Sequence, residues 1–286
     1  MIHEKIELWG RDERRKGFYR GDAGDGFVPA MDSYILDGNK RRPAVLICPG
    51  GGYGFRSPRE SEPVALQFNA AGFHAFVLRY SVAPRRHPLP LLDVSRAVGL
   101  LREKADAWKI HPDRIALCGF SAGAHLAASL GVFWDRLAVP EFLPEAAAAG
   151  LELRQELRQE PRLLPRLNRP DALEAVSLEL HVSAKTPPAF LWHTYGDEAV
   201  PLENSLLFAG ALRSAGVPFE FHVYPEGLLA HIARHRRDER CGQGARLPCL
   251  VLDAALPRVA GRIVRRVNWR RWAGAGPALQ WRWDGG

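Results

Sequence analysis

Short apolar runs alternate along this chain with segments whose apolar residues recur at helical spacing. The runs lack the polar alternation of a half-exposed strand, which is typical of strands buried on both faces of a sheet. The predicted strands cover residues 44–48, 75–80, 114–118, 188–193 and 219–224. The predicted helices cover residues 61–71, 91–107, 122–130 and 202–215. Buried strands separated by helices predict an α/β fold, with a mainly parallel sheet and helices on both faces.

Two stretches depart from this pattern. Residues 135–185 contain no β-branched run, and residues 151–159 are a Leu/Glu/Arg segment of helical character. Residues 226–286 carry twelve arginines, no lysine and five acidic residues, so the whole net charge of +7 lies there. Four of the eight tryptophans also lie in this end of the chain. We therefore predict one domain over 1–227, with an atypical helical segment or cap at 135–185, and an extension of uncertain structure over 228–286.

Composition narrows the class of protein. The chain has 286 residues, of which 47% are hydrophobic and 25% charged, an ordinary globular balance. No apolar run approaches the roughly 18 residues of a membrane helix, and the first residues lack the apolar core of a signal peptide. The four cysteines form no CxxC pair, so neither a disulfide framework nor a zinc site is expected. We expect a cytoplasmic protein without metal or cofactor.

The most informative motif is Gly119-Phe120-Ser121-Ala122-Gly123. The pattern G-x-S-x-G is weak alone, but here a predicted strand leads directly in and a predicted helix leads directly out. Such a sharp strand-to-helix turn lifts the serine hydroxyl clear of the sheet, and its small flanking residues avoid collisions. The motif predicts Ser121 as a nucleophile, and the alternative is a glycine-rich turn with an incidental serine.

A second glycine cluster follows the strand at 44–48. In Pro49-Gly50-Gly51-Gly52-Tyr53, small residues let backbone N–H groups approach a ligand closely. With the N–H of Ala122, the N–H groups of this loop could hold the oxyanion of a tetrahedral intermediate, and Tyr53 could contact the substrate. A phosphate cradle is disfavoured because no GK[ST] follows. A plain turn is the remaining alternative.

An acid and a base are needed to activate a serine. Asp197 follows the strand at 188–193 and is preferred over Glu198, although an N-cap or a solvated loop acid is the alternative. The chain order serine, acid, histidine leaves His222, His231 and His235 as candidates for the base. We select His231, because His222 lies within a predicted strand and His235 lies in an arginine-rich run. The earlier histidines, His125 among them, are assigned solvated or structural roles.

These motifs together resemble a small α/β-hydrolase of the acetylesterase or acetyl-xylan-esterase-like group. The resemblance is carried by residues 42–53, 62–65, 71–84, 118–127, 186–194 and 197–227, about half of the chain. It implies a serine esterase in which Ser121 is the nucleophile and Asp197 the orienting acid. It also implies oxyanion donors at Gly51, Gly52 and Ala122, and hydrolysis of short acyl esters, acetyl groups on carbohydrate included.

The chain departs from that family in two places. The family usually has a strand after the nucleophile helix, and 135–185 offers none, so the sheet lacks a central strand or the segment forms a helical cap. The family also has a His-Gly pair after 225–227, where this chain has Leu228-Leu229-Ala230-His231. The end of the chain is interpreted as an out-of-frame product of a GC-rich gene, as a basic tail for nucleic acid or anionic membrane, or as a solvated extension.

The sequence therefore predicts a serine carboxylic-ester hydrolase with a small-molecule ester substrate. Neither nucleic acid nor membrane is the expected partner, and the sequence does not define the oligomeric state. Two alternatives remain open. One is a peptidase of related fold, although nothing resembles its propeller. The other is a hydrolase-like protein that lacks a competent histidine and only binds its ligand.

Overall fold

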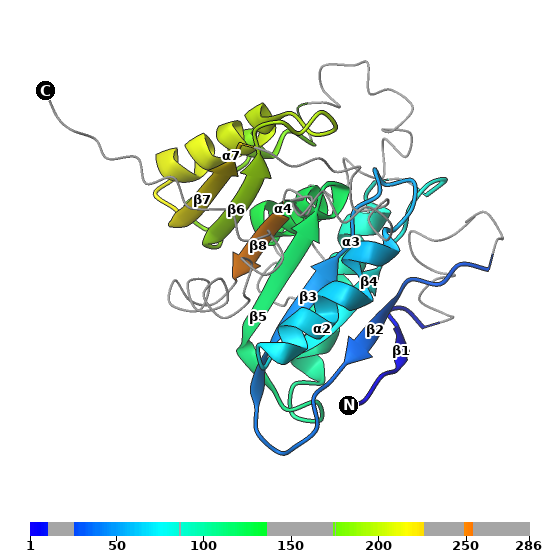
Figure 1. Cartoon of the computed structure of the whole chain (residues 1–286). Helices are drawn as coiled ribbons and strands as arrows, with labels where there is room; N and C mark the ends of the chain where they lie inside the picture. The colour runs from blue at the N-terminus through cyan, green and yellow to red at the C-terminus, as the bar shows by residue number, and fades with distance from the viewer. Residues whose placement is uncertain (11–25, 86, 136–173, 175, 226–248, 254–286) are drawn as a thin grey trace, which may run out of the picture.

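The computed structural model describes residues 1–10, 26–85, 87–135, 174 and 176–225, and the backbone of 249–253. One sheet of eight strands runs through this described part of the chain in the order β1-β2-β4-β3-β5-β8-β6-β7 (Figure 1). In chain order the strands are β1 (Lys5–Glu7), β2 (Ala30–Tyr34), β3 (Arg42–Cys48), β4 (His74–Arg79), β5 (Ile110–Phe120), β6 (Ala189–Thr194), β7 (Phe219–Tyr224) and β8 (Cys249–Asp253).

The sheet is mixed, with most strands running in one direction. β3 pairs in parallel with both β4 and β5, and β6 pairs in parallel with β7. β2 is antiparallel to β1 and β4, and β8 is antiparallel to β5 and β6. Because β8 is antiparallel to both neighbours, β5 and β6 run in the same direction. Their carboxyl ends therefore lie at the same edge of the sheet.

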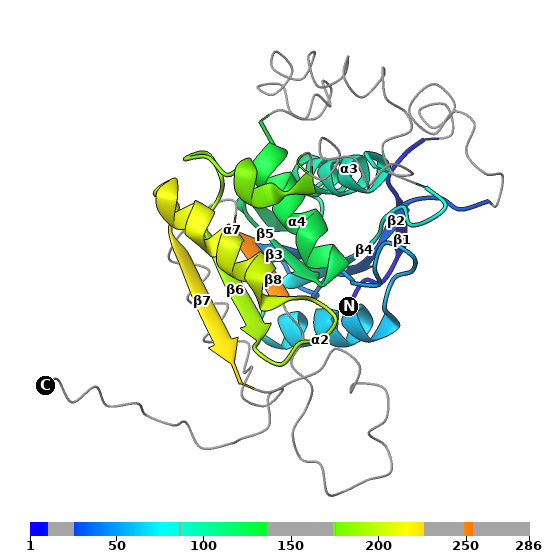
Figure 2. The ribbon, with the colours of Figure 1, turned by 90° about the horizontal axis from the view of Figure 1, so that it is seen from above.

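Helices cover both faces of the sheet, as the sequence predicts. The α-helices among the described residues are α2 (Glu62–Ala70), α3 (Leu89–Glu103), α4 (Ala122–Phe133) and α7 (Leu202–Ser214), and η1 (Pro58–Glu60) and η3 (Leu178–Leu180) are short 3-10 turns. Seen from above in Figure 2, α2 lies on one side of the strands, whereas α3, α4 and α7 lie on the other. This arrangement confirms the predicted α/β fold class.

Two apolar clusters follow from the alternation of side chains along the strands. Along β3, Ala44 and Leu46 join the cluster that contains α3, α4 and α7, whereas Val45 and Ile47 join the cluster under α2. Both sets are fully buried, which is why β3 is apolar throughout. The same division in β4 and β5 explains the unbroken apolar runs seen in the sequence.

The centre of the sheet contains a strand that the sequence analysis did not predict. β8, from the arginine-rich end of the chain, lies between β5 and β6 and pairs with both. The sequence analysis found no strand in 135–185 and expected either a sheet without a central strand or a helical cap. β8 stands at this central place in the sheet, and residues 136–173 lie outside the described part. Without β8, the β5 edge would present unpaired backbone N–H and C=O groups. The predicted boundary at 227 stays a prediction.

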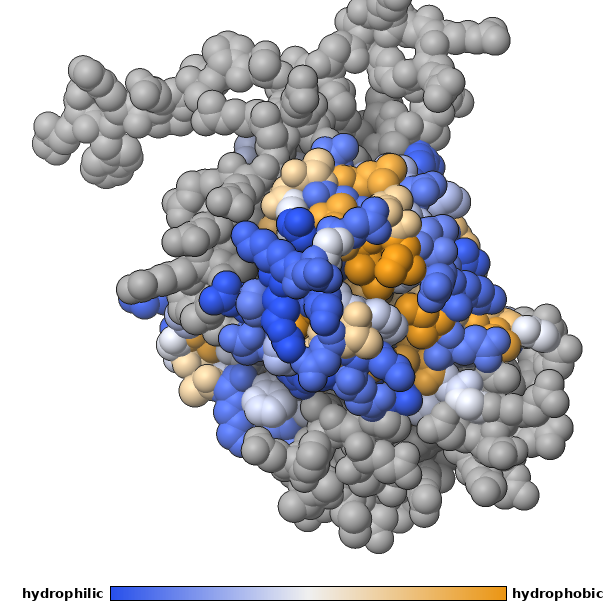
Figure 3. Space-filling view, turned by 90° about the horizontal axis from the view of Figure 1, so that it is seen from below, coloured by the Kyte–Doolittle hydropathy of each residue, from blue (hydrophilic) through white to orange (hydrophobic). Residues whose placement is uncertain are grey.

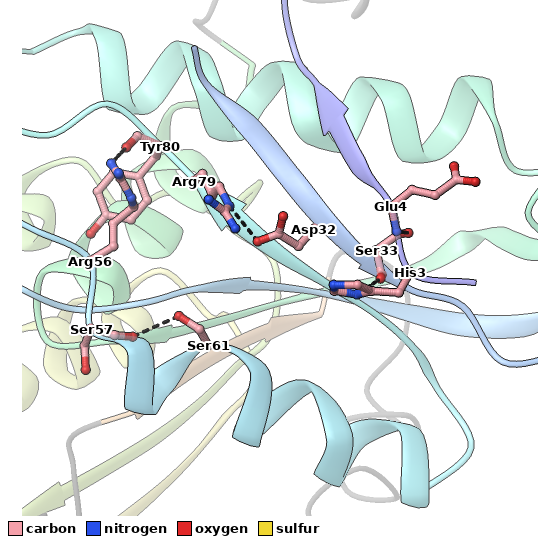
Figure 4. Close-up of polar contacts among 9 residues, drawn as sticks. All are labelled: His3, Glu4, Asp32, Ser33, Arg56, Ser57, Ser61, Arg79 and Tyr80. Atoms are coloured by element: carbon pink, nitrogen blue, oxygen red, sulfur yellow. Dashed lines mark hydrogen bonds and ion pairs between the residues drawn. The ribbon is translucent and has the colours of Figure 1, made fainter. Parts of the chain in front are cut away.

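The N-terminal edge of the sheet was also missed, because β1 and β2 are short and partly polar. Asp32 of β2 accepts a 2.6 Å hydrogen bond from Arg79 Nε of β4, and Ser33 Oγ accepts one of 3.0 Å from the Glu4 N–H (Figure 4). β5 begins four residues before the predicted strand at 114–118. There the pairing with β3 shifts, since Arg42 faces Ile110 and Ala44 faces Ile115.

Length and hydropathy decide whether a helix of the described part of the chain could cross a membrane. None of its helices is both long and apolar enough to cross a bilayer. Figure 3 views the end of the molecule opposite to the carboxyl ends of β3 and β5, where hydrophilic side chains are interspersed with smaller hydrophobic patches.

Candidate active site

The predicted nucleophile lies on a strained turn between β5 and α4. Ser121 has φ 50° and ψ −121°, a left-handed φ that costs a non-glycine residue of order 1–3 kcal/mol. The helix begins at once, because the N–H groups of Ala124 and His125 donate to Ser121 O at 2.9 and 3.1 Å. A serine in a strained conformation on a sharp turn between a strand and a helix is the geometry of a nucleophile elbow.

The two outer glycines of the motif are sterically required. A Cβ at Gly119 would lie 2.1 Å from Gly123 O, and one at Gly123 would lie 2.0 Å from Cys48 O in β3. Neither obstacle is a flexible side chain, so any larger residue would have to displace backbone. The spacing of the motif therefore reflects contact between the elbow and the neighbouring strand.

The glycine loop after β3 lies directly beside the elbow. A Cβ at Gly50 would lie 3.1 Å from the Cβ of Ser121, so the loop backbone and the serine are in contact range. Gly51, Gly52 and Tyr53 have φ values of 133°, 58° and 57°, which turn the chain sharply. Ala122 is the first residue of α4, where N–H groups have no intrahelical acceptor. The structure thus places the glycine loop and the start of α4 beside Ser121, and the roles of Gly51, Gly52 and Ala122 as oxyanion donors stay a prediction.

A buried carboxylate that the sequence analysis missed supports this loop. Glu60 Oε2 accepts a hydrogen bond of 2.6 Å from the Gly50 N–H, and the residue is 5% exposed. Burial raises the pKa of Glu60, while the Gly50 hydrogen bond and Arg59 act in the opposite direction. An acid in a stretch rich in charged residues looks solvated in sequence, and only its position in η1, packed under the loop, reveals the contact.

Further contacts fix the loop to the end of β4. Arg56 Nη1 donates to Tyr80 O at 2.6 Å, as Figure 4 shows, and Tyr80 OH donates to Pro49 O at 2.7 Å. The Tyr53 hydroxyl lies 2.9 Å from His125 Nδ1 on α4. Each contact ties the oxyanion loop to an element of the rigid scaffold, which is how a site gains a fixed geometry.

The predicted acid lies past the end of β6, at the same edge of the sheet as Ser121. Asp197 Oδ1 accepts from the Ala199 and Val200 N–H groups at 2.9 and 3.0 Å. Its Oδ2 is buried and has no hydrogen-bond partner among the described residues, and the residue is 8% exposed. Glu198, the competing carboxylate, is exposed. Because a buried carboxylate oxygen without a donor is costly, Asp197 is suited to receive a histidine N–H.

The described histidines near this acid are engaged elsewhere. His193 places Nδ1 2.7 Å from Ser205 Oγ and Nε2 3.0 Å from Val200 O. His222 lies on β7 with Nε2 2.6 Å from Glu220 Oε1. His231, the predicted base, and His235 lie outside the described residues. The structure therefore places the serine, the glycine loop and an acid at one edge of the sheet, and their catalytic roles and the identity of the base stay predictions.

Other features of the described chain lie away from this chemistry. A partly open pocket of about 340 Å³ lies between α3, α4, β5 and residues 185–188, and its lining contains neither the elbow nor the oxyanion loop. No cluster of His, Cys, Asp or Glu in the described ranges could hold a metal ion. Burial raises the pKa of Cys48 far above its ordinary value, so this thiol is a core residue.

Comparison with known proteins agrees with this geometry. The BD-FAE family model matches residues 31–152, which include both glycine motifs, and the Prolyl oligopeptidase family model matches residues 159–243. An acetyl ester-xyloside bifunctional hydrolase from Caldicellulosiruptor lactoaceticus is 37% identical, with a TM-score of 0.64 over 79% of this chain and 86% of that one. MGS-M1, an alpha/beta hydrolase from a deep-sea metagenome, is 30% identical, with a TM-score of 0.56 over 80% and 83% of the two chains.

Curated relatives are longer proteins. Endo-1,4-beta-xylanase B of Butyrivibrio fibrisolvens is 35% identical over 239 residues, which is 77% of this chain and 36% of that protein. Acetylxylan esterase of Xylanibacter ruminicola is 26% identical over 208 residues, covering 68% of this chain and 42% of that protein. The chain thus spans less than half the length of these two relatives.

Sheet, elbow and relatives together define the class: the chain is an α/β-hydrolase. Within that fold it belongs to the esterases of the acetylesterase and acetyl-xylan-esterase-like group. The resemblance drawn from the sequence motifs is confirmed.

Proposed function

We propose that this chain is a serine carboxylic-ester hydrolase for short acyl esters, with acetyl groups on carbohydrate as its substrate class. The observation that carries the proposal is the elbow: Ser121 is held at φ 50° beside a glycine loop with backbone donors. The orphaned Oδ2 of Asp197 at the same edge of the sheet supports it. The printed names of two relatives, an acetylxylan esterase and an acetyl ester-xyloside hydrolase, support the acyl group.

The proposed mechanism is acyl transfer through the serine. His231 takes the Ser121 proton while Asp197 orients the imidazole and stabilises the imidazolium that forms. Ser121 Oγ attacks the ester carbonyl, and the N–H groups of Gly51, Gly52 and Ala122 hold the oxyanion. The alkoxide leaves with the proton from the histidine, and water then attacks the acyl-enzyme by the same route to release the acid.

The test is hydrolysis of p-nitrophenyl acetate by the purified chain and its variants. Ser121→Ala and His231→Ala should each lose at least about 1000-fold in kcat, since the nucleophile and the base act as one unit. Ser214→Ala, at the end of α7 away from the site, is the matched control and should keep wild-type activity. His222→Ala and His235→Ala test the other candidate bases.

Two outcomes contradict the proposal. A folded wild-type chain without esterase activity favours the alternative of a ligand-binding protein that lacks a competent base. Equal activity of Ser121→Ala and wild type shows that hydrolysis does not proceed through the elbow. Release of acetate from acetylated xylo-oligosaccharides then tests the carbohydrate part of the proposal. The rate of hydrolysis of p-nitrophenyl butyrate, compared with that of p-nitrophenyl acetate, tests the acyl length.

A further inference from the structure

His125 lies on α4, one helical turn after Ser121, and the mechanism above does not use it. Both its ring nitrogens are engaged: Nδ1 lies 2.9 Å from the Tyr53 hydroxyl, and Nε2 lies 3.0 Å from Val176 O. A carbonyl oxygen can only accept, so Nε2 must carry the hydrogen and donate it. Nδ1 is then an acceptor, and the Tyr53 hydroxyl donates to it.

This assignment requires a neutral imidazole, and the surroundings favour one. Burial lowers the pKa of His125 below its ordinary value, against the opposing effects of the Val176 carbonyl and of Glu179 in η3. His87, the other histidine whose charge couples to this ring, also has its pKa lowered by burial. A protonated ring would carry hydrogen on both nitrogens and could no longer accept from Tyr53.

Tyr53 is the residue through which this bond reaches the site. It follows Gly52 directly and has φ 57°, a left-handed backbone that costs a non-glycine residue roughly 1–2 kcal/mol. Its carbonyl accepts from the Ala83 N–H at 2.8 Å, and its ring meets the Tyr80 ring edge-on at 6.1 Å. With its hydroxyl donated to His125, Tyr53 links the glycine loop to α4.

We propose that His125 is a positioning residue that fixes the oxyanion loop against the nucleophile helix through its bond to Tyr53. The same imidazole ties Val176, the residue that precedes η3 by two positions, to both. The inference rests on the proposed function, because it assigns the bond a role in holding the Gly51 and Gly52 N–H groups. Displacement of such groups by about 1 Å can cost about 100-fold in rate.

A double-mutant cycle separates this role from general packing. Tyr53→Phe removes only the hydroxyl group. His125→Leu keeps a side chain of similar volume but removes both the acceptor and the donor nitrogen of the ring. Each should lower kcat by about 10- to 100-fold with KM changed far less, since the donors act mainly in the transition state. The double variant should be no slower than His125→Leu alone, because that change already removes the bond to Tyr53 together with the bond to Val176.

Rescue and control variants complete the test. In His125→Gln the amide can accept from Tyr53 and donate to Val176, so most of the lost kcat should return. His181→Gln is the matched control, because His181 also contacts a carbonyl of this region, Glu174 O at 2.9 Å, but no residue of the loop. It should keep wild-type kcat.

The inference is overturned if Tyr53→Phe keeps the wild-type kcat, or if the losses of the two single variants multiply in the double variant. It is also overturned if ¹⁵N NMR of the imidazole shows hydrogen on Nδ1, a readout that needs no activity. A wild-type chain that hydrolyses no ester contradicts the proposed function itself. An active wild type with an equally active Tyr53→Phe contradicts only this inference.

Discussion

At the scale of single residues, the site is defined by groups whose local geometry is unfavourable unless a partner compensates for it. Ser121 keeps a left-handed φ, and Asp197 keeps a buried oxygen without a donor among the described residues. Both features cost free energy in a resting protein. Their presence at one edge of the sheet is the reason to assign chemistry there.

The orphaned oxygen of Asp197 leads to a specific prediction. Asp197→Asn keeps an oxygen that can accept from the Ala199 and Val200 N–H groups, so the loop should retain its shape. The amide cannot accept a histidine N–H at the Oδ2 position, and kcat should fall by up to about 10⁴-fold, the order of loss that changing a triad aspartate to asparagine can cause. Steady-state hydrolysis of p-nitrophenyl acetate measures the loss.

The neighbouring acid provides the control for this change. Glu198→Gln alters an exposed carboxylate one residue away and should leave kcat within about twofold, as is usual for surface positions. If Glu198→Gln loses as much activity as Asp197→Asn, the acid has been assigned to the wrong residue.

Glu60 gives a second prediction at this scale. Glu60→Ala leaves the buried Gly50 N–H without an acceptor, which should destabilise the fold by about 1–3 kcal/mol and lower kcat through the loop. Glu60→Gln retains an acceptor oxygen and should be closer to wild type in both. Thermal unfolding and kcat are compared with Glu62→Ala, an exposed acid at the start of α2. A Glu60→Ala variant as stable and active as Glu62→Ala would contradict the support role.

The sequence predicted part of the site at this scale. Ser121 and the glycine loop were identifiable because backbone geometry demands particular residues at fixed spacing. Glu60 and the pairing of Tyr53 with His125 could not be identified, since their partners are brought together only where η1 and α4 meet the loop that follows β3. An acid or a histidine in sequence carries no mark of the donor that it will meet.

At the scale of elements, the elbow depends on close approach between α4 and β3. Gly123→Ala places a methyl group 2.0 Å from Cys48 O, so strand or helix must move. We expect a loss of about 3 kcal/mol or more in the free energy of unfolding, together with loss of activity. Urea unfolding followed by circular dichroism measures the stability.

Gly210→Ala in α7 is the matched control for that steric effect. Gly210 is exposed, and a Cβ there meets nothing within 4 Å, so the change should stabilise the helix by up to about 1 kcal/mol. If both alanine variants shift stability by the same amount and sign, the close approach at the elbow is not a determinant of the fold.

Long apolar elements were predicted to within a few residues, and short or displaced ones were not. The strand at 219–224 matches β7, and the helix at 202–215 matches α7 closely. β2 was missed because Asp32 and Ser33 interrupt its apolar pattern, although pairing with β4 buries both. β8 was missed because its pairing with β5 and β6 spans a long stretch of chain, and local pattern carries no such information.

At the scale of the whole molecule, buried histidines make stability depend on pH. Burial lowers the pKa of His74 and His125, and lowers that of His87 to about 4. Below the ordinary value of 6.5 the unfolded chain therefore binds more protons than the folded one, and stability falls as pH drops toward about 4. Burial raises the pKa of Glu60, so the contribution of this residue to stability falls as pH rises above the ordinary pKa of a glutamate.

The test compares how the urea midpoint of unfolding changes with pH in the wild type and in one histidine variant. Urea midpoints at pH 7.5, 6.5 and 5.5 should fall with acidification, and His87→Gln should show a shallower fall. Each pKa unit between the folded and unfolded states corresponds to about 1.4 kcal/mol. Identical slopes in the two proteins would show that His87 is not held neutral by the fold.

The position of β8 has a consequence for the order in which the molecule can be made. Synthesis proceeds from the amino end, and domains generally fold as they emerge. Here β1 to β5 and the β6–β7 pair leave the ribosome before the strand that joins them, since β8 starts at Cys249. The growing chain carries two partial sheets with facing unpaired edges until then. A chaperone that shields such edges during translation, rather than after release, should therefore matter most for the yield of this protein.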